Sequence, residues 1–411
     1  MSRDWALLRL GDFLSELPKS TLPASCSEAN GAYAFYCSSS EPKAADTWLQ
    51  EQPAILMGTG GVASVHLGKG KYAYSTDTWA IRIKESAKLT QPYAYRVLEL
   101  SLPKIDYAGF EGSGLRHLRK SYIKDFRFLA PSDSAPQKRI VSILDGIDTA
   151  IEKTEALIAK YQQIKAGLMH DLFTRGVLPN GKLRPPREQA PELYQETAIG
   201  WIPREWGVKP CADLCSRICV GIVIQPTQYY VEDGVPAFRS ANVREDGIDP
   251  NNFVYISAGA NRLLAKSQVK TGDIVSVRTG YPGTSAVIPP EFQGANCIDI
   301  LISTPNEKVT SEYLCDWINS SFGKGQVLRQ QGGMAQQHFN VGEMRELLVA
   351  LPDLNEQERI RGKIKSVSGK LAIEKALAEK LQAQKSGLMH DLLTGKVPVN
   401  IKKTTTTEVA A

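Results

Sequence analysis

The sequence lacks the apolar runs that mark membrane and secreted proteins. No run approaches the roughly 18 consecutive apolar residues of a membrane span, and the opening residues MSRDWALLRLGDFLSEL contain no apolar stretch typical of secretory signals. The seven cysteines are scattered and odd in number, which favours a reducing compartment over a disulfide framework. We therefore expect a cytoplasmic protein.

Motifs for catalysis and cofactor binding are also missing. The sequence has no G-x-x-x-x-G-K-S/T phosphate loop, no G-x-G-x-x-G after a strand, no H-E-x-x-H and no G-x-S-x-G. It also lacks the Asn-Pro-Pro-aromatic run that amino-methyltransferases use on adenine. We therefore expect no catalytic residues and no cofactor bound by this chain.

One cysteine group needs a separate argument. Cys211, Cys215 and Cys219 follow an i, i+4, i+8 spacing that would align three thiols on one helical face. A metal site would need a fourth ligand and usually a tighter C-x₂-C pair. We therefore expect small buried residues on a short helix, and no metal site.

What the 411-residue chain does contain is a long internal repeat. The phrase GLMHDLFTRGV at residues 167–177 returns as GLMHDLLTGKV at residues 387–397, an offset of 387 − 167 = 220 residues. Further residues match at this offset: Gln137 with Gln357, Arg139 with Arg359, and Ile140 with Ile360. The period far exceeds the roughly 20–50 residues of solenoid repeats and indicates a duplicated domain.

Each copy lies in a long segment with helical spacing of apolar residues. From Ile140 to Leu172 and from Ile360 to Leu392 these residues follow a heptad pattern. A helix of about forty residues rises about 60 Å, and its apolar stripe would be exposed unless it were covered. We expect the two helices to pack on each other as an antiparallel coiled coil with pseudo-twofold symmetry. The alternative is that each helix packs only on its own globular half.

Glycine and histidine recur inside these predicted helices. Gly167 and Gly387 each cost about 1 kcal/mol relative to alanine, which we expect close approach of another backbone to offset. His170 and His390 each precede an aspartate, but neighbouring helical residues point in different directions and no nucleophile is near. A structural or partner-contact role is therefore favoured over catalysis.

The remaining residues predict an α+β fold class with two mixed α/β domains in tandem. Short apolar runs such as PAILMG, TWAIRI, GDIVSVRTG and CIDILIS are typical of strands between Gly, Pro and Ser turns. The predicted division is 1–132 for the first domain, 133–176 for the central long helix, 177–200 for a linker, 201–352 for the second domain, 353–396 for the C-terminal long helix and 397–411 for a flexible tail.

Polar and basic side chains gather in glycine-containing loops of both halves. Such side chains match the base edges of DNA, and glycine lets a backbone approach phosphate. A single loop of this kind is usually a solvated turn, but two sets in a duplicated chain favour nucleic-acid contact. The candidates in the first half are Thr59, His66, Lys69, Lys71, Arg116, His117, Arg119 and Lys120. Those in the second half are Arg239, Ser240, Asn242, Arg244, Arg278, Thr279, Tyr281, Arg329, Gln336, Gln337 and His338.

In combination, these features resemble the DNA-specificity subunit of type I restriction-modification systems. The resemblance spans nearly the whole chain and rests on PQKRIVSILDGIDTAIEK, GLMHDLFTRG, IGWIPREW, EQERI and GLMHDLLTGKV. It implies that each globular half is a target-recognition domain for one half of a split double-stranded DNA site. The helices would be the spacer between them.

The resemblance also implies partners in a prokaryotic cytoplasm. Two modification subunits would carry the adenine-N6 methyltransferase chemistry and bind S-adenosylmethionine, and motor-nuclease restriction subunits would use ATP and Mg. The partner surface would lie on the helical segments, with these candidates: Gly167, Leu168, Met169, His170, Leu172, Gly387, Leu388, Met389, His390 and Leu392.

Two alternatives stay open from the sequence. The chain could be a scaffold whose paired domains bind proteins, or the specificity subunit of a stand-alone methyltransferase without a nuclease. The net charge of +5 permits an acidic partner without requiring one. DNA affinity that falls steeply with salt would exclude the scaffold.

Overall fold

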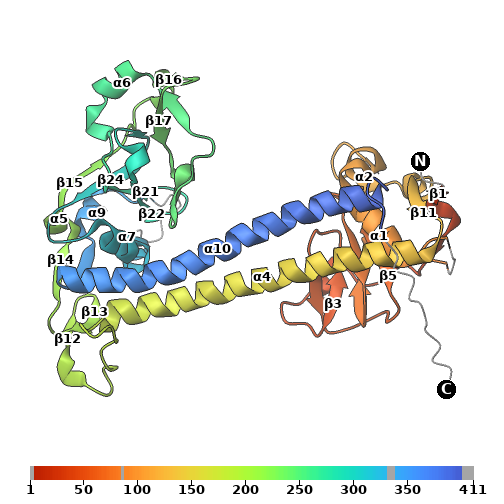
Figure 1. Cartoon of the computed structure of the whole chain (residues 1–411), viewed down its shortest axis with the longest axis horizontal. Helices are drawn as coiled ribbons and strands as arrows, with labels where there is room; N and C mark the ends of the chain where they lie inside the picture. The colour runs from red at the N-terminus through yellow and green to blue at the C-terminus, as the bar shows by residue number, and fades with distance from the viewer. Residues whose placement is uncertain (1–3, 85–87, 331–337, 400–411) are drawn as a thin grey trace, which may run out of the picture. The chain divides into compact units, whose positions relative to one another are not determined.

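The computed structural model describes residues 4–84, 88–330 and 338–399. Two compact units divide the chain: unit 1 is Met1–Glu155 with Ala376–Ala411, and unit 2 is Ala156–Lys375. The boundary lies inside both long helices, α4 (Ser134–Arg175) and α10 (Leu354–Leu393) (Figure 1). Each unit therefore combines one globular half with the start of one long helix and the end of the other.

Unit 1 contains three main sheets and three short helices among its described residues. The central antiparallel sheet has the order β2 (Leu14–Glu16), β8 (Thr78–Ile83), β5 (Ala54–Gly58), β6 (Val65–Gly68). A second sheet has the order β4 (Lys43–Ala45), β3 (Tyr33–Tyr36), β7 (Tyr72–Tyr74), and β1 (Trp5–Arg9) pairs with β11 (Arg127–Pro131). The other elements are β9 (Phe110–Glu111), β10 (His117–Leu118), α1 (Gln91–Leu100), α2 (Leu102–Gly109) and α3 (Lys120–Lys124).

Unit 2 repeats this plan. Its central antiparallel sheet has the order β15 (Cys215–Val220), β24 (Ile300–Pro305), β21 (Ile274–Val277), β22 (Ser285–Val287). A second sheet has the order β16 (Tyr230–Val231), β20 (Val254–Ile256), β17 (Val235–Phe238), β23 (Asn296–Cys297), and β14 (Gly207–Pro210) pairs with β25 (Leu348–Leu351).

The remaining elements of unit 2 are shorter. They are β12 (Tyr194–Thr197), β13 (Gly200–Pro203), β18 (Val243–Arg244), β19 (Gly247–Ile248), α5 (Cys211–Leu214), α6 (Ala258–Leu263), α7 (Ser311–Asn319), α8 (Ser321–Gln330) and α9 (Val341–Glu346). The predicted fold class is confirmed, because two mixed helix-and-sheet domains occur in tandem and a long helix follows each. No helix within the described ranges is long and apolar enough to cross a membrane.

A buried glutamine anchors the start of each long helix in the same way. Gln137 accepts from the amide of Thr90 at 2.8 Å and donates to the carbonyl oxygens of Lys88 and Pro131. Gln357 accepts from the amide of Thr310 at 2.8 Å and donates to the carbonyl oxygens of Lys308 and Pro352. The repeat seen in the sequence is thus a repeat of three-dimensional contacts.

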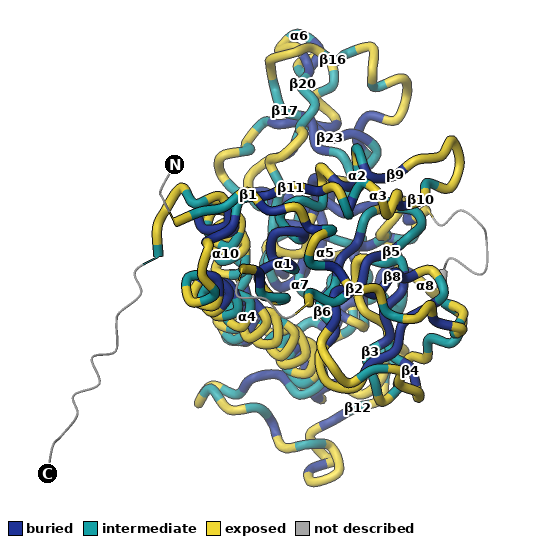
Figure 2. The backbone as a smooth tube through the Cα atoms, turned by 90° about the vertical axis from the view of Figure 1, so that its right-hand side faces the viewer, coloured by how far each residue is buried: buried dark blue, intermediate teal, exposed yellow. Residues whose placement is uncertain are grey.

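The start of α4 and the end of α10 both pack into the core of unit 1. Ile140 and Leu144 of α4 and Met389, Leu392 and Leu393 of α10 belong to one buried cluster with the central sheet and α1. The start of α4 runs beside the end of α10 in this unit (Figure 1). The sheet strands β5 and β8 lie in the buried interior, whereas outward turns of the helices are exposed (Figure 2).

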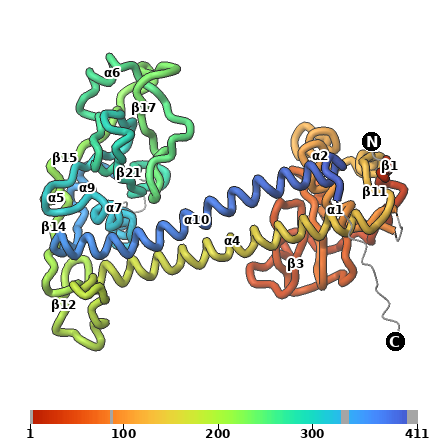
Figure 3. The backbone as a smooth tube through the Cα atoms, in the orientation of Figure 1, coloured from red at the N-terminus to blue at the C-terminus, as the bar shows by residue number. Residues whose placement is uncertain are grey.

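Unit 2 has the reciprocal arrangement. Met169, Leu172 and Phe173 at the end of α4 share a buried cluster with Ile360 and Ile364 at the start of α10. Figure 3 shows these two helix ends side by side. Within each unit the start of one helix therefore packs against the end of the other, as an antiparallel pair requires.

A network of charged side chains joins the helices of unit 1. Arg96 on α1 is buried and contacts Glu99 at 2.8 Å, Asp145 at 2.6 Å and Asp148 at 2.5 Å. Lys385 on α10 contacts Asp148 at 2.8 Å and Glu99 at 3.2 Å. These contacts add charged hydrogen bonds to the apolar packing.

The equivalent position in unit 2 carries the opposite charge, because 96 + 220 = 316 is an aspartate. Burial raises the pKa of Asp316 from 3.8 to about 6, although Lys165 and Arg361 act in the opposite direction. The folded protein then binds this proton more tightly than the unfolded chain. Asp316 therefore contributes stability at low pH that is lost as the pH rises from about 4 to about 6.

We expect Asp316→Asn to remove this pH-dependent loss of stability. The variant should therefore have a higher melting temperature than the parent protein at pH 7. Thermal unfolding of both proteins across this pH range measures the difference. If the melting temperatures of the two proteins changed with pH in the same way, the pKa of Asp316 would not differ between the folded and unfolded states.

Residues 177–200, predicted as a linker, are packed into unit 2. Val177 and Arg184 are buried, and β12 pairs with β13. The Glu356 carboxylate on α10 accepts hydrogen bonds from Arg184, from Trp206 Nε1 at 3.0 Å and from the amide of Val177 at 2.7 Å. This segment is therefore bonded to the start of α10.

Candidate nucleic-acid interface

Two polar segments meet in unit 1. The loop after β5 carries Thr59, and the segment around β10 carries His117. The amide of Leu118 donates to the carbonyl oxygen of Thr59 at 3.0 Å, and that of Gly61 donates to the carbonyl oxygen of Arg116 at 2.9 Å. Two candidate segments from distant parts of the sequence thus form one surface.

The same two segments meet in unit 2. The amide of Phe339 donates to the carbonyl oxygen of Arg278 at 2.9 Å. The hydroxyl of Thr279 and Nδ1 of His338 share a hydrogen bond of 2.9 Å. Arg278 directly follows β21 just as Thr59 directly follows β5, and their carbonyl oxygens accept the matching hydrogen bonds. The offset of about 220 residues between the two sets of loops is the sequence signal of this correspondence.

Exposed apolar side chains project from these loops. Tyr281 is 82% exposed, Val62 is 69% exposed and Leu115 is 67% exposed. Val62 and Leu115 were not predicted as site residues, because an isolated apolar residue in a loop has no distinctive pattern. Such side chains can contact thymine methyl groups or insert between base steps.

The Asp106 carboxylate holds the two segments of unit 1 together. It accepts from the amide of Ala63 at 2.8 Å and from Arg116 Nη2 at 3.0 and 2.9 Å. The Ala63 amide and the Arg116 guanidinium lower the pKa of Asp106, which keeps the carboxylate ionised. Arg116, a candidate for DNA contact, therefore positions the loops and has most of its charge compensated.

Most other predicted cations also have partners within their own unit. The contacts are Lys71 with Glu51, Arg119 with Glu111, Lys120 with Glu16, Arg239 with the carbonyl oxygen of Asn252, Arg244 with Asp249, Arg278 with Asp299, and Arg329 with the carbonyl oxygen of Gly325. Fewer positive charges are therefore free to contact DNA than the number of basic residues in these loops suggests.

Two candidates of the first half lie elsewhere in unit 1. His66 and Lys69 line a separate hollow of about 320 Å³ together with Asp145, Asp148 and Glu152 of α4. Nε2 of His66 also lies 2.8 Å from the carbonyl oxygen of Ser39. The structure does not bring these two residues together with Thr59 and His117.

The prediction that Asn242 contacts DNA is wrong. Its side chain is 1% exposed. The amide accepts from the Arg239 backbone at 3.0 Å and donates to the carbonyl oxygens of Asp249 and Asn251. Asparagine favours such local backbone bonds, so Asn242 shapes the turn that carries Ser240 and Arg244. Gln336 and Gln337 lie outside the described residues.

In the repeated helical sequence, residues 167–172 and 387–392, some side chains are buried and others are exposed. Met169 and Leu172 are buried in unit 2, and Met389 and Leu392 are buried in unit 1. These four residues build the cores of their own units, which corrects their prediction as partner contacts. Gly167, His170, Gly387 and His390 are exposed, and Leu168 and Leu388 are half-buried.

The expected close approach at the repeated glycines does not occur among the residues that the structure describes. A Cβ atom added at Gly167 or Gly387 would meet no atom within 4 Å outside its own local backbone. His170 stacks on Phe322 with ring centroids 5.6 Å apart. The cost of the two helical glycines is therefore not offset by packing in this structure.

The three cysteines are buried, as expected, but they do not share a helix. Cys211 lies in α5, whereas Cys215 and Cys219 lie in β15. Cys215 begins the strand that pairs with β24, and this pairing overrides the helical spacing. Within the part of the chain that the structure describes, no group of three or more His, Cys, Asp or Glu side chains could hold a metal ion.

Comparison with known proteins gives concordant results. Residues 2–163 match the family described as Type I restriction modification DNA specificity domain. The type I restriction enzyme MjaVIII specificity subunit of Methanocaldococcus jannaschii is 22% identical, over 96% of this chain and 93% of that protein. The putative MjaX specificity subunit of the same organism is 26% identical over 64% of this chain and 57% of that protein.

Solved structures share the fold. The S subunit of a type I restriction-modification system from M. genitalium matches with a TM-score of 0.64 at 14% identity, covering 96% of this chain and 97% of that one. A chain from a study of complex assembly in the type I R-M system matches with a TM-score of 0.52 at 14% identity, covering 96% and 99%. Residues 2–163 thus match the type I specificity-domain family, and over nearly its whole length the chain is similar to the specificity subunits of type I restriction-modification systems.

Proposed function

We propose that this chain selects a two-part target on double-stranded DNA, with unit 1 contacting one half and unit 2 the other. The observation that carries the proposal is the duplicated pair of loops, Thr59 with His117 in unit 1 and Thr279 with His338 in unit 2. Equivalent loops on equivalent sheets are what two recognition domains of one duplicated chain require.

The chemistry of the loop tips supports base contact rather than phosphate contact alone. Arg116 and Arg278 are engaged by Asp106 and Asp299, so they position the loops. Tyr281, Val62 and Leu115 are strongly exposed on these loops, and they carry no positive charge. Apolar and aromatic contacts of this kind discriminate between bases, whereas phosphate contacts do not.

The exposed side of the repeated phrase is proposed to dock two modification subunits. Gly167, His170 and Leu168 form this docking face in unit 2, and Gly387, His390 and Leu388 form it in unit 1. A helical glycine with open space above it allows a partner helix to approach closely. This would account for the same glycine in both copies, although no described part of the chain packs on it.

The chain is proposed to be non-catalytic within its complex. The modification subunits would supply the adenine-N6 methyltransferase activity and bind S-adenosylmethionine, and restriction subunits would supply the motor and nuclease that use ATP and Mg. The support is the lack of a nucleotide-binding, amino-methyltransferase or hydrolase motif in the sequence.

We accordingly expect the purified chain to bind DNA but neither to methylate nor to cleave it. Activity should appear when the modification subunits are added. Methyl transfer from labelled S-adenosylmethionine and cleavage of plasmid DNA are the measurements. Methyl transfer by a preparation shown by mass spectrometry to contain only this chain would contradict the proposal.

A gel-shift series at increasing salt tests DNA binding itself. Binding that weakens linearly with the logarithm of salt concentration is expected, because contacts with phosphates release counterions. Absence of binding at low salt, with and without the modification subunits, would favour a protein-binding scaffold. Methylation in a host that lacks a restriction subunit would identify a stand-alone modification enzyme.

A further inference from the structure

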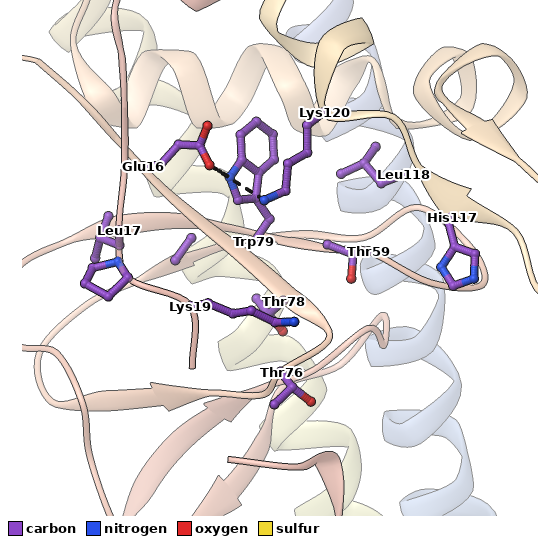
Figure 4. A pocket seen from close by; sticks show the side chains of 12 residues that line it. Glu16, Leu17, Lys19, Thr59, Thr76, Thr78, Trp79, His117, Leu118 and Lys120 are labelled. Carbon is purple, nitrogen blue, oxygen red and sulfur yellow. Dashed lines mark hydrogen bonds and ion pairs between the residues drawn. The ribbon is translucent and has the colours of Figure 1, made fainter. Parts of the chain in front are cut away.

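A cavity of about 420 Å³ lies in unit 1 beside the proposed recognition loops (Figure 4). Its walls come from the end of β2, the start of β8, the loop after β5 and the segment from β10 to α3. The residues that carry the argument are Glu16, Lys19, Thr59, Thr78, Trp79, His117 and Lys120. Three of them, Thr59, His117 and Lys120, were already candidates for DNA contact.

The interior of the cavity has few groups left to recognise a base. The Thr59 hydroxyl donates to the carbonyl oxygen of Asp77 at 2.9 Å, and the Thr78 hydroxyl donates to that of Tyr36 at 3.0 Å. The Lys120 ammonium lies over the Trp79 ring, 5.0 Å from its centroid, and covers a face on which a base could stack. An extrahelical base would therefore find no free hydroxyl on Thr59 or Thr78 and no free aromatic surface on Trp79.

The charge of the cavity favours an anion instead. Glu16 accepts from Trp79 Nε1 at 2.9 Å and contacts Lys124 at 2.7 Å and Lys120 at 3.6 Å, so its negative charge is compensated. Hydrogen bonds from Lys124 and Trp79 lower the pKa of Glu16 and keep these contacts in place at neutral pH.

Lys19 and His117 are donors of the lining that remain available to a ligand, as does the hydroxyl of Thr76. Lys19 and His117 line the cavity from different walls, Lys19 from the segment after β2 and His117 from β10 (Figure 4). Among the described residues, neither side chain has an ion pair or a hydrogen bond. Lys19 therefore adds a free positive charge within reach of the loop that carries Thr59.

We propose that this cavity binds a phosphate group of the DNA backbone, with Lys19 as its cationic ligand and His117 as a second donor. The proposal rests on the proposed function and refines it, because it separates a phosphate contact in the cavity from base contacts at the loop tips. Unit 2 has Leu301 where the strand pairing of unit 1 has Trp79, so the phosphate contact belongs to unit 1.

The test uses the full-length chain with its modification subunits and a duplex that contains its target. Single phosphates of the duplex are replaced in turn by uncharged methylphosphonates, and the dissociation constant is measured for each. The parent protein should lose affinity at one position near the unit 1 half-site. Lys19→Ala should bind the unmodified duplex more weakly than the parent protein does. It should lose no further affinity when that phosphate is replaced. The slope of log affinity against log salt concentration should be smaller in magnitude by about 0.9.

Lys43→Ala is the matched control, because Lys43 is an exposed lysine of unit 1 on β4, outside the cavity. Equal effects of Lys43→Ala and Lys19→Ala would overturn the proposal, since they would reflect general surface charge. An unchanged methylphosphonate profile in Lys19→Ala would also overturn it. Stabilisation by inorganic phosphate with no sensitive backbone position would assign the cavity to a free anion. Failure of the parent protein to bind DNA would refute the proposed function itself.

Discussion

Replacing Gly387 with leucine is expected to leave one modification subunit bound per chain instead of two. The chain itself has room for the new side chain, because a Cβ at Gly387 meets nothing within 4 Å, and leucine favours the helix. A close helix-to-helix contact has no such room. Overpacking by about 1–3 kcal/mol would weaken docking roughly 5- to 150-fold. Native mass spectrometry of the assembled complex gives the stoichiometry directly.

Gly369→Leu is the control for this substitution. Gly369 also lies in α10 with open space around it, but the equivalent residue in the other copy is Thr149 rather than glycine. This variant should retain both subunits. If Gly387→Leu also retained both subunits with unchanged affinity, the repeated phrase would not be the docking face.

Replacing Glu356 with alanine is expected to reduce the stability of unit 2 by about 3–5 kcal/mol, because it leaves the buried Arg184 without its buried partner and with only the exposed Glu205. Glu356 and Arg184 are both buried, and the carboxylate also accepts from Trp206 and Val177. Gly176, which ends α4 with φ +64°, packs closely against this carboxylate. Loss of the carboxylate would free Arg184, Trp206 and the end of α4 together.

Urea unfolding of Glu356→Ala measures this loss, and Glu358→Ala provides the comparison. Glu358 lies two residues further along α10 and is exposed, so its loss should change stability by less than about 0.5 kcal/mol. If the two variants unfolded at the same urea concentration, the buried network would not support unit 2.

The long helices and the duplication could be predicted because both leave a regular signal. The heptad patterns predicted helices at 133–176 and 353–396, and the structure has them at Ser134–Arg175 and Leu354–Leu393. The repeated glutamine was visible as a match at the offset of 220. Its role in anchoring each helix was not visible, because two of its three bonds go to backbone groups 47 to 49 residues earlier in the chain.

The candidate site was harder to predict, because burial and pairing depend on distant residues. Asn242 has the composition of a recognition residue, yet three backbone bonds occupy its amide. Arg116 looks free in the sequence, but Asp106, ten residues earlier, engages it. Lys19 lies in no motif, and only the fold brings it to the cavity beside His117. The repeat offset alone pairs Thr59 with Thr279, whereas the hydrogen bonds of the structure match Thr59 with Arg278.

Mapping adenine methylation across the genome of cells that carry the complete system tests most directly whether the two units contact two halves of one target. The parent chain should direct methylation to a single two-part sequence with a fixed gap. Tyr281→Ala in unit 2 should relax or weaken one half by about 1–3 kcal/mol, and Leu115→Ala in unit 1 should affect the other half. If both substitutions weakened both halves equally, or altered the same half, the division of recognition between the two units would be wrong.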